Sequence, residues 1–190
     1  MKKILLLVLA VSLLVSTVGC FGPRRSKRLR APAFNATAIA SAAMKQYDLN
    51  GDGQISGDEL DKAPSIKSAF PNLTSVTETE IANRVRIWKE TRIGLQIASV
   101  KFTQGGKPVD GAEVTVASED FMGGAKIQFS DKTNASGVIT LTAPNAENLP
   151  GVPCGFYKID VQYKGKTYHF GIEVGEGSGS GDAPTYELKE

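Results

Sequence analysis

Side chains that carry oxygen recur at alternate positions in the twelve-residue segment 48–59, and a carboxylate closes it. Their order matches the pattern D-x-[DN]-x-[DN]-G-x5-E, in which oxygens converge on one hard cation. The seventh position of that pattern uses its backbone carbonyl, the ninth a hydroxyl or a bridging water, and the last a bidentate carboxylate. The sequence therefore predicts one Ca²⁺ site. Its ligands would be Asp48, Asn50, Asp52, Gln54, Ser56 and Glu59.

Two further positions of the segment support a metal loop. Gly53 falls where such a loop bends sharply, a conformation that a side chain resists. Ile55 lies between ligands, where an apolar residue of a short strand could pair with a neighbouring loop. The alternative is an ordinary turn rich in Asp, Asn and Gly. An ordinary turn needs no glutamate at its end, so Glu59 favours the metal loop.

Helices are expected on both sides of this loop. The first should begin at a cap on Asn35 and end at Tyr47, and a short helix should cover residues 57–62. Pro64 ends the short helix and can start the next one. A last helix should open at Thr77, because a glutamate three residues later completes a capping box. The predicted metal loop would therefore join two helices.

The same spacing predicts a second loop that lacks metal ligands. When Val76 is aligned with Ile55, residues 69–80 take the loop positions and Glu80 takes the last one. One carboxylate cannot replace the hydration shell of an ion. We therefore expect a scaffold loop that packs beside the first through Val76 and Ile55. The first, third and fifth ligand positions of this second loop fall on Ala69, Pro71 and Leu73.

Beyond about residue 93 the chain reads as short strands separated by Gly, Pro, Asn and Asp. Apolar and polar residues alternate in segments 157–163 and 168–174, which predicts a hairpin over an apolar core. His169 falls on the polar face of that hairpin. No nucleophile is signalled beside it, so no catalytic role is expected for this histidine.

Three segments of this half share a pattern with a known class of module. They are GKPVDGAEVTV at 106–116, TNASGVITL at 133–141, and LPG at 149–151 followed by GFYKIDV. Their order resembles the carboxypeptidase-regulatory, transthyretin-like modules of bacterial surface proteins. The resemblance implies a small β-sandwich over residues 94–190.

The first residues of the chain have the pattern of an export signal. Lys2 and Lys3 precede an apolar stretch at 4–14, and small residues lead to Cys20. The junction resembles the lipobox of bacterial lipoproteins, although Thr17 stands where that family usually has Leu. The resemblance implies that Cys20 is acylated and becomes the mature N-terminus. An ordinary cleaved signal with an incidental cysteine is the alternative.

Charge is distributed unevenly along the mature chain. Removing Lys2 and Lys3 from the 22 Lys and Arg leaves 20, which equals the 20 Asp and Glu. Beside a lipid anchor, a basic tether would favour anionic headgroups; a solvated linker is the alternative. Nucleic-acid binding is not expected, because the cluster has no interleaved aromatic residues. Five bases and no acid lie in residues 21–30, namely Arg24, Arg25, Lys27, Arg28 and Arg30.

The second cysteine has no disulfide partner if Cys20 is acylated. We therefore expect Cys154 to be a small buried apolar residue, with a reactive thiol as the alternative.

The expected fold class is α+β multidomain, with an N-terminal helical EF-hand pair, one loop of which is degenerate, followed by a small Ig-like or transthyretin-like β-sandwich. Residues 1–19 would be a lipoprotein signal peptide and 20–33 the lipid anchor and basic tether. Residues 34–92 would form the EF-hand domain and 93–190 the β-sandwich domain.

This combination resembles small EF-hand lipoproteins of planctomycete-type bacteria. The resemblance implies an exported, lipid-anchored Ca²⁺-binding protein of the cell envelope, facing the periplasm or in the outer membrane. No enzymatic activity is expected, because the sequence shows no recognisable active site. Its expected partners are membrane lipid, through acylated Cys20, and an envelope protein or a glycan. The alternatives are a dockerin-like, calcium-dependent assembly module and a carbohydrate-binding accessory protein.

Overall fold

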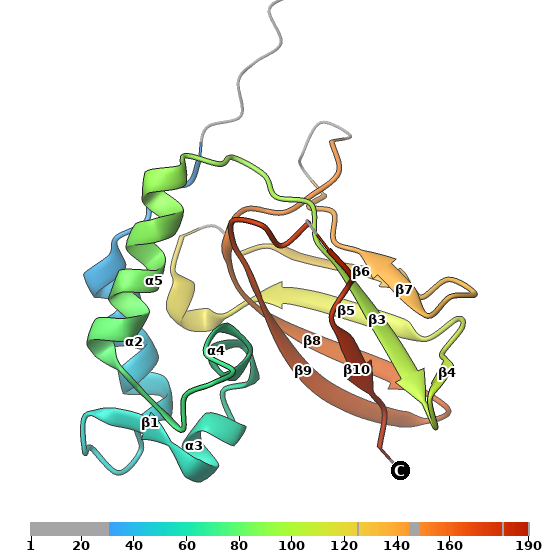
Figure 1. The fold of residues 1–190 in the computed structure, drawn as a ribbon, viewed down its shortest axis with the longest axis horizontal. Coiled ribbons are helices and arrows are strands. Elements are labelled where there is room, and N and C mark those ends of the chain that lie inside the picture. The colour runs from blue at the N-terminus through green and yellow to red at the C-terminus, as the bar shows by residue number, and fades with distance from the viewer. Residues whose placement is uncertain (1–30, 125, 145–148, 180, 190) are drawn as a thin grey trace, which may run out of the picture.

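The structure is a computed structural model that describes residues 31–124, 126–144, 149–179 and 181–189 (Figure 1). Its helices are α2 (Ala36–Tyr47), α3 (Gly57–Asp61), α4 (Pro64–Ala69), α5 (Glu78–Thr91) and the 3-10 helix η2 (Asp120–Met122). Its strands are β1 (Gln54–Ser56), β2 (Ser75–Thr77), β3 (Ser99–Gln104), β4 (Lys107–Pro108), β5 (Glu113–Ser118), β6 (Gln128–Lys132), β7 (Val138–Thr140), β8 (Gly155–Tyr163), β9 (Lys166–Val174) and β10 (Thr185–Glu187).

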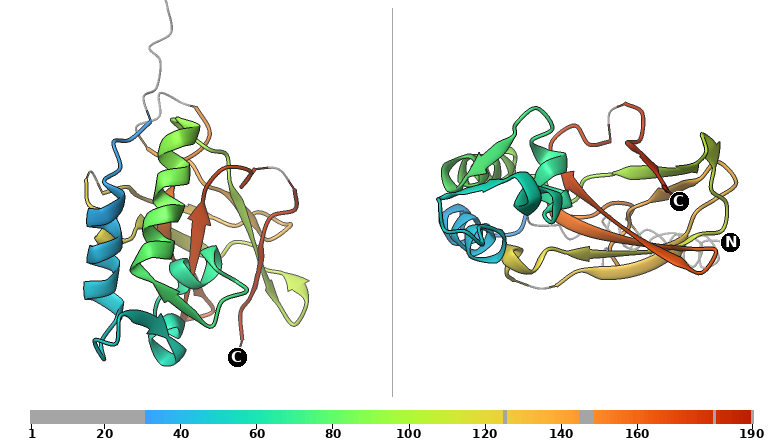
Figure 2. Two further views of the ribbon diagram at one scale, coloured as in Figure 1. Left: turned by 60° about the vertical axis from the view of Figure 1, so that its left-hand side comes forward. Right: turned by 90° about the horizontal axis from the view of Figure 1, so that it is seen from below.

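The strands form three sheets. A two-stranded ladder joins β1 and β2, one four-stranded sheet has the order β6-β5-β8-β9, and the other has the order β10-β3-β4 with β7 also paired to β3. All pairs are antiparallel except β10 with β3. The two larger sheets face each other and enclose one apolar core, and the helices lie at one end of them (Figure 2).

Two of the helices are short because prolines follow them closely. α3 has five residues and α4 has six. A residue that precedes proline is disfavoured in the helical region. Accordingly, Ala63 before Pro64 has φ −114° and ψ 61°, and Phe70 before Pro71 has φ −127° and ψ 59°. Each helix therefore ends after one to two turns.

The helices share a core with the strands. Phe121, Cys154 and Phe156 from the strand half are buried among the apolar residues of the helices. Trp88 of α5 meets Phe156 of β8 edge-on, with ring centroids 4.9 Å apart. The backbone of α4 also lies directly on β9, because a Cβ added at Gly171 would sit 2.2 Å from the backbone nitrogen of Ser65. Apolar packing thus crosses the expected domain boundary at residues 92–93.

The expected fold class is wrong. The described residues are mostly β, with ten strands in three sheets and four short α-helices. A helical EF-hand pair followed by a separate β-sandwich does not fit this arrangement. The physical reasons are the two proline stops, which shorten the helices, and the shared core, which makes the helices a cover on the strands.

Several local predictions are confirmed. α2 begins after Asn35, whose side chain accepts a hydrogen bond from the backbone of Ala38 at 3.1 Å, and ends at Tyr47. Strands β8 and β9 form the predicted hairpin. The side chain of His169 is exposed and lies 2.7 Å from Asp160 on the outer face. Within the described residues, no helix is long and apolar enough to cross a membrane.

Candidate calcium loop

Residues 48–56 connect α2 to α3 and contain β1, and residues 57–59 are the first residues of α3. Strand β1 pairs with β2 in the predicted register, which sets Ile55 opposite Val76. Both side chains are fully buried. This pairing holds the second half of the loop against the second, ligand-poor loop and leaves the first half to be shaped by its own side chains.

The carboxylate of Asp48 organises the first half of the loop. Its Oδ1 accepts hydrogen bonds from the backbone of Gly51 at 2.8 Å and Asp52 at 3.2 Å, and its Oδ2 accepts one from Gly53 at 3.1 Å. Gly51 and Gly53 have φ of 73° and 83°, a region that favours glycine. The sharp bend predicted at Gly53 is confirmed.

The next two predicted ligands contact each other and the backbone. Asn50 Oδ1 accepts from the backbone of Asp52 at 2.8 Å, and Asn50 Nδ2 donates to Asp52 Oδ2 at 3.1 Å. Asp52 Oδ1 accepts from the backbone of Gln54 at 2.9 Å. Asn50, Asp52 and Gln54 are exposed and Ser56 is half-buried. These oxygens therefore lie at the solvent side of the loop.

Glu59 folds back from α3 onto the start of the loop. Its Oε1 accepts backbone hydrogen bonds from Leu49 at 2.8 Å and Asn50 at 3.0 Å, and its Oε2 accepts one from Ser56 at 3.3 Å. The residue is only 8% exposed, and no described side chain forms an ion pair with it. Backbone N–H groups, one of them in a capping box with Ser56, therefore compensate part of the charge of this carboxylate, and no described basic side chain adds to that.

The donor set fits a hard cation in its chemistry. All six predicted ligands offer oxygen, the loop bends at glycine, and the last carboxylate closes on the first turn, as a Ca²⁺ loop requires. Within the described residues, however, no three His, Cys, Asp or Glu side chains are grouped closely enough to hold a metal. The carboxylates are instead held by backbone N–H groups of the loop.

The second loop provides no comparable set. Glu80 forms a capping box with Thr77, as Glu59 does with Ser56, and its Oε2 accepts from both the backbone and the hydroxyl of Thr77 at 2.7 Å. The predicted capping box is thus confirmed. The first, third and fifth positions of this second loop are Ala69, Pro71 and Leu73, and the paired strand β2 carries the apolar Val76 into the core.

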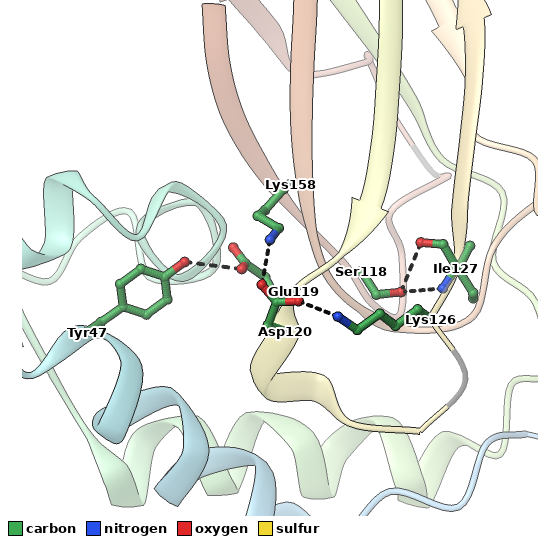
Figure 3. Close-up of polar contacts among 7 residues, drawn as sticks. All are labelled: Tyr47, Ser118, Glu119, Asp120, Lys126, Ile127 and Lys158. Carbon is green, nitrogen blue, oxygen red and sulfur yellow. Dashed lines mark hydrogen bonds and ion pairs between the residues drawn. The ribbon is translucent and has the colours of Figure 1, made fainter.

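A buried carboxylate joins the start of the loop to the strands. Tyr47, the last residue of α2, donates its hydroxyl to Glu119 at 3.1 Å (Figure 3). Ser65 of α4 donates to the same carboxylate at 2.6 Å. Glu119 is 1% exposed, and this burial raises its pKa. Burial likewise raises the pKa of Tyr47. Sequence patterns did not single out Glu119.

Beside this carboxylate, an exposed acid is neutralised by two lysines. Asp120 accepts from Lys126 at 2.8 Å and from Lys158 at 2.9 Å (Figure 3). These contacts lower the pKa of Asp120 to about 2, and the hydrogen bond from Lys126 has the largest effect. Lys158 therefore binds Asp120 and not Glu119, which leaves the buried carboxylate with hydroxyl donors.

The other predicted functional residues lie apart from the loop. Cys20 is outside the described residues. Cys154 is buried, as expected, and burial raises the pKa of its thiol to about 11. A thiol with that pKa is protonated near neutral pH, which does not favour a reactive role.

Comparisons with known proteins give only weak structural likenesses. The sequence matches no protein family and no curated protein. Among solved structures, a 9R-lipoxygenase from Cyanothece PCC8801 is 13% identical with a TM-score of 0.26, and an (S)-allantoin synthase is 13% identical with a TM-score of 0.27. The matches cover 78% and 80% of this chain but only 23% and 63% of those chains. Likenesses this weak carry no functional argument.

Proposed function

We propose that this protein is an exported, lipid-anchored Ca²⁺-binding protein of the cell envelope, whose strand-rich body provides a binding or spacing surface. The observation that carries the proposal is the closed loop 48–59. Glu59 is buried without a cation and returns to the backbone of Leu49 and Asn50. A divalent cation among the loop oxygens would add positive charge that the three backbone N–H donors to Glu59 supply only in part.

The ligands would be the six residues expected from the sequence. Asp48 begins the loop at the end of α2, and Glu59 closes it from α3. When bound, Ca²⁺ supplies positive charge shared by carboxylate, amide, hydroxyl and backbone oxygens. The loop residues hold α2, β1 and α3 in one arrangement. The hydrogen bond from Tyr47, at the end of α2, to Glu119, directly after β5, connects that arrangement to the strands. The proposed role of Ca²⁺ is therefore to order the helices on the sheet.

The proposed export of this protein favours a low affinity for Ca²⁺. Extracellular calcium modules bind at about 10⁻⁴–10⁻³ M, whereas intracellular sensors bind at about 10⁻⁷–10⁻⁵ M. Mg²⁺ should compete poorly, because it prefers a smaller six-coordinate shell and cannot easily use a bidentate glutamate.

Unfolding measurements with added ions test this proposal. An ion that binds only the folded state stabilises it by about 2.7 kcal/mol at a concentration 100 times Kd. Urea unfolding with excess Ca²⁺ should therefore show a higher midpoint than with chelator, and equal Mg²⁺ should give a smaller increase. Equal midpoints with Ca²⁺, Mg²⁺ and chelator would reject calcium binding.

We propose no enzymatic activity, and no observation favours the other two functions. A dockerin-like module would use two ligand-bearing loops, and residues 69–80 lack the ligands. A glycan site favours exposed planar rings, but the strongly exposed large apolar residues in the described part of the chain are aliphatic. Calcium-dependent capture of an envelope protein would support the dockerin-like function. Binding on a glycan array would support the carbohydrate-binding function.

A further inference from the structure

The end of the helical layer opposite the calcium loop is basic. Arg86, Lys89 and Arg92 are exposed in the last turns of α5 and at its C-cap, and we call these three residues the basic end. All three line one open hollow between α5 and the start of α2, together with the single acid Glu90. None of the three forms an ion pair with a described residue, although Arg86 donates to Asn83.

The chain enters the fold beside the basic end. Phe34 lines the same hollow and packs edge-on against Trp88 of α5, with ring centroids 5.8 Å apart. Both ribbon views place the first described residues at the C-terminal end of α5, with α2 running from there toward the calcium loop (Figures 1 and 2). The 12 residues of α2 separate the two ends by about 18 Å.

Charge is therefore polarised along the helical layer. The five bases within residues 21–30 precede the entry point in the sequence and have the same sign as the basic end. Ile87, which is 46% exposed, adds an apolar side chain next to Arg86. The opposite end carries more acids than bases, because Lys62 and Lys67, the latter paired with Asp61, are outnumbered. The acids in and around the loop include Asp48, Asp52, Asp58, Asp61 and Glu78.

We propose that the basic end is a membrane-facing surface that binds anionic lipid headgroups. The proposal takes its biological setting from the proposed lipid anchor. Cys20 lies eleven residues before Ala31, a length that spans at most about 40 Å. An anchored chain therefore keeps the basic end within reach of the bilayer. The acidic end is repelled by the same surface, so the calcium loop faces away from the membrane.

A second physical role for these cations must be separated from lipid binding. Cations in the last turn of a helix interact favourably with its dipole, which needs no lipid. That role predicts a loss of helix stability when the charges change. A lipid-binding role predicts a loss of vesicle binding in a variant that remains folded.

The test is sedimentation with vesicles of equal parts phosphatidylglycerol and phosphatidylcholine, with pure phosphatidylcholine as reference. The protein is the chain from Cys20 onward carrying Cys20→Ser, so that no acyl chain contributes. The test variant combines Arg86→Glu, Lys89→Glu and Arg92→Glu. The control variant makes the same change in charge at three exposed lysines elsewhere, Lys62→Glu, Lys107→Glu and Lys166→Glu.

Each base near an anionic surface strengthens binding about fivefold. The test variant should therefore bind the anionic vesicles about 100-fold more weakly or worse, while the control variant loses far less. Equal losses in the two variants, or unchanged binding in the test variant, would overturn the proposal. If circular dichroism shows that the Glu variant is unfolded, the Gln variant at the same three positions replaces it and should also lose binding.

Orientation gives a second readout. A polarity-sensitive dye at Ile87→Cys should shift to the blue on anionic vesicles, whereas the same dye at Thr79→Cys, two turns away on α5, should not. Cys154 is 2% exposed and does not compete for the dye. Equal shifts at both positions would contradict the proposed orientation. Calcium titration of the same variants separates failure of the lipid proposal from failure of the proposed function. Absence of calcium binding would reject the proposed function, and the vesicle-binding result would still stand.

Discussion

The buried carboxylate between the helices and the strands should make stability fall as pH rises. Glu119 is 1% exposed and accepts hydrogen bonds from Tyr47 and Ser65. Burial is the largest effect on this group and raises its pKa, while the two hydroxyls and nearby Lys158 oppose that effect and Asp120 adds to it. The folded state therefore holds the Glu119 proton more tightly than the unfolded chain does.

The sign of the pH dependence follows from linkage. Where the folded state binds more protons than the unfolded state, the free energy of unfolding decreases as pH increases. The contribution of Glu119 is fully present below the ordinary glutamate value of 4.5 and is lost as pH rises through the raised pKa. Each unit of difference corresponds to about 1.4 kcal/mol.

The perturbation is Glu119→Gln, which keeps the shape and one carbonyl acceptor but cannot ionise. Relative to the wild type, the variant should gain stability as pH rises above about 4.5, by about 1.4 kcal/mol for each unit by which the pKa of Glu119 is raised. Urea unfolding at several pH values measures this difference. The fluorescence of the one tryptophan, Trp88, reports directly, because its ring contacts Phe156 across the interface of helices and strands.

An opposite control lies one residue away. The pKa of Asp120 is lowered to about 2 by its lysines, so its contribution is present above the ordinary value of 3.8 and is lost as pH falls toward 2. Asp120→Asn should therefore change stability in the opposite direction. If the wild type and Glu119→Gln give parallel curves from pH 4 to 7, the burial argument for Glu119 is refuted.

Three further predictions concern packing, a partly buried ion pair and the anchor. Gly171→Ala should lower the free energy of unfolding by about 1–3 kcal/mol in urea titration, because its Cβ would sit 2.2 Å from the backbone of Ser65; an unchanged midpoint would show that α4 moves freely. Arg84→Met should cost about 1.5–3 kcal/mol by removing two 2.6 Å contacts from Glu173, which is 7% exposed, and a loss below 0.5 kcal/mol would contradict this. Cys20→Ser should move the protein from the membrane fraction to the soluble fraction, and an N-terminal peptide without acyl mass in the wild type would rule out the anchor.

Local features of this fold follow from sequence patterns. The cap at Asn35, the capping box at Thr77 and the β8–β9 hairpin each depend on residues within a few positions of one another. The pairing of Ile55 with Val76 was also predictable, because the repeated spacing around the two loops sets its register. Such signals require no knowledge of how the rest of the chain packs.

The fold class and the buried carboxylate depend on distant contacts. Tyr47 and Glu119 are 72 positions apart, and Trp88 reaches Glu173 across 85. No periodicity in the sequence reports which strand a helix will cover. The short helices have a local signal, since Pro64 and Pro71 each stop a helix, and this signal argues against a helical pair.

The central claim is that residues 48–59 form one Ca²⁺ site and residues 69–80 form none. Titration calorimetry of Ca²⁺ into the wild type, Glu59→Gln and Glu80→Gln tests it most directly. The wild type should bind one ion per chain. Glu59→Gln should weaken binding more than about tenfold, or about 1.4 kcal/mol, because it removes a charge and the two-oxygen contact. Glu80→Gln should bind like the wild type, because Ala69, Pro71 and Leu73 place no side-chain ligand in the loop that Glu80 ends. Two ions in the wild type, or equal loss in both variants, would contradict the account.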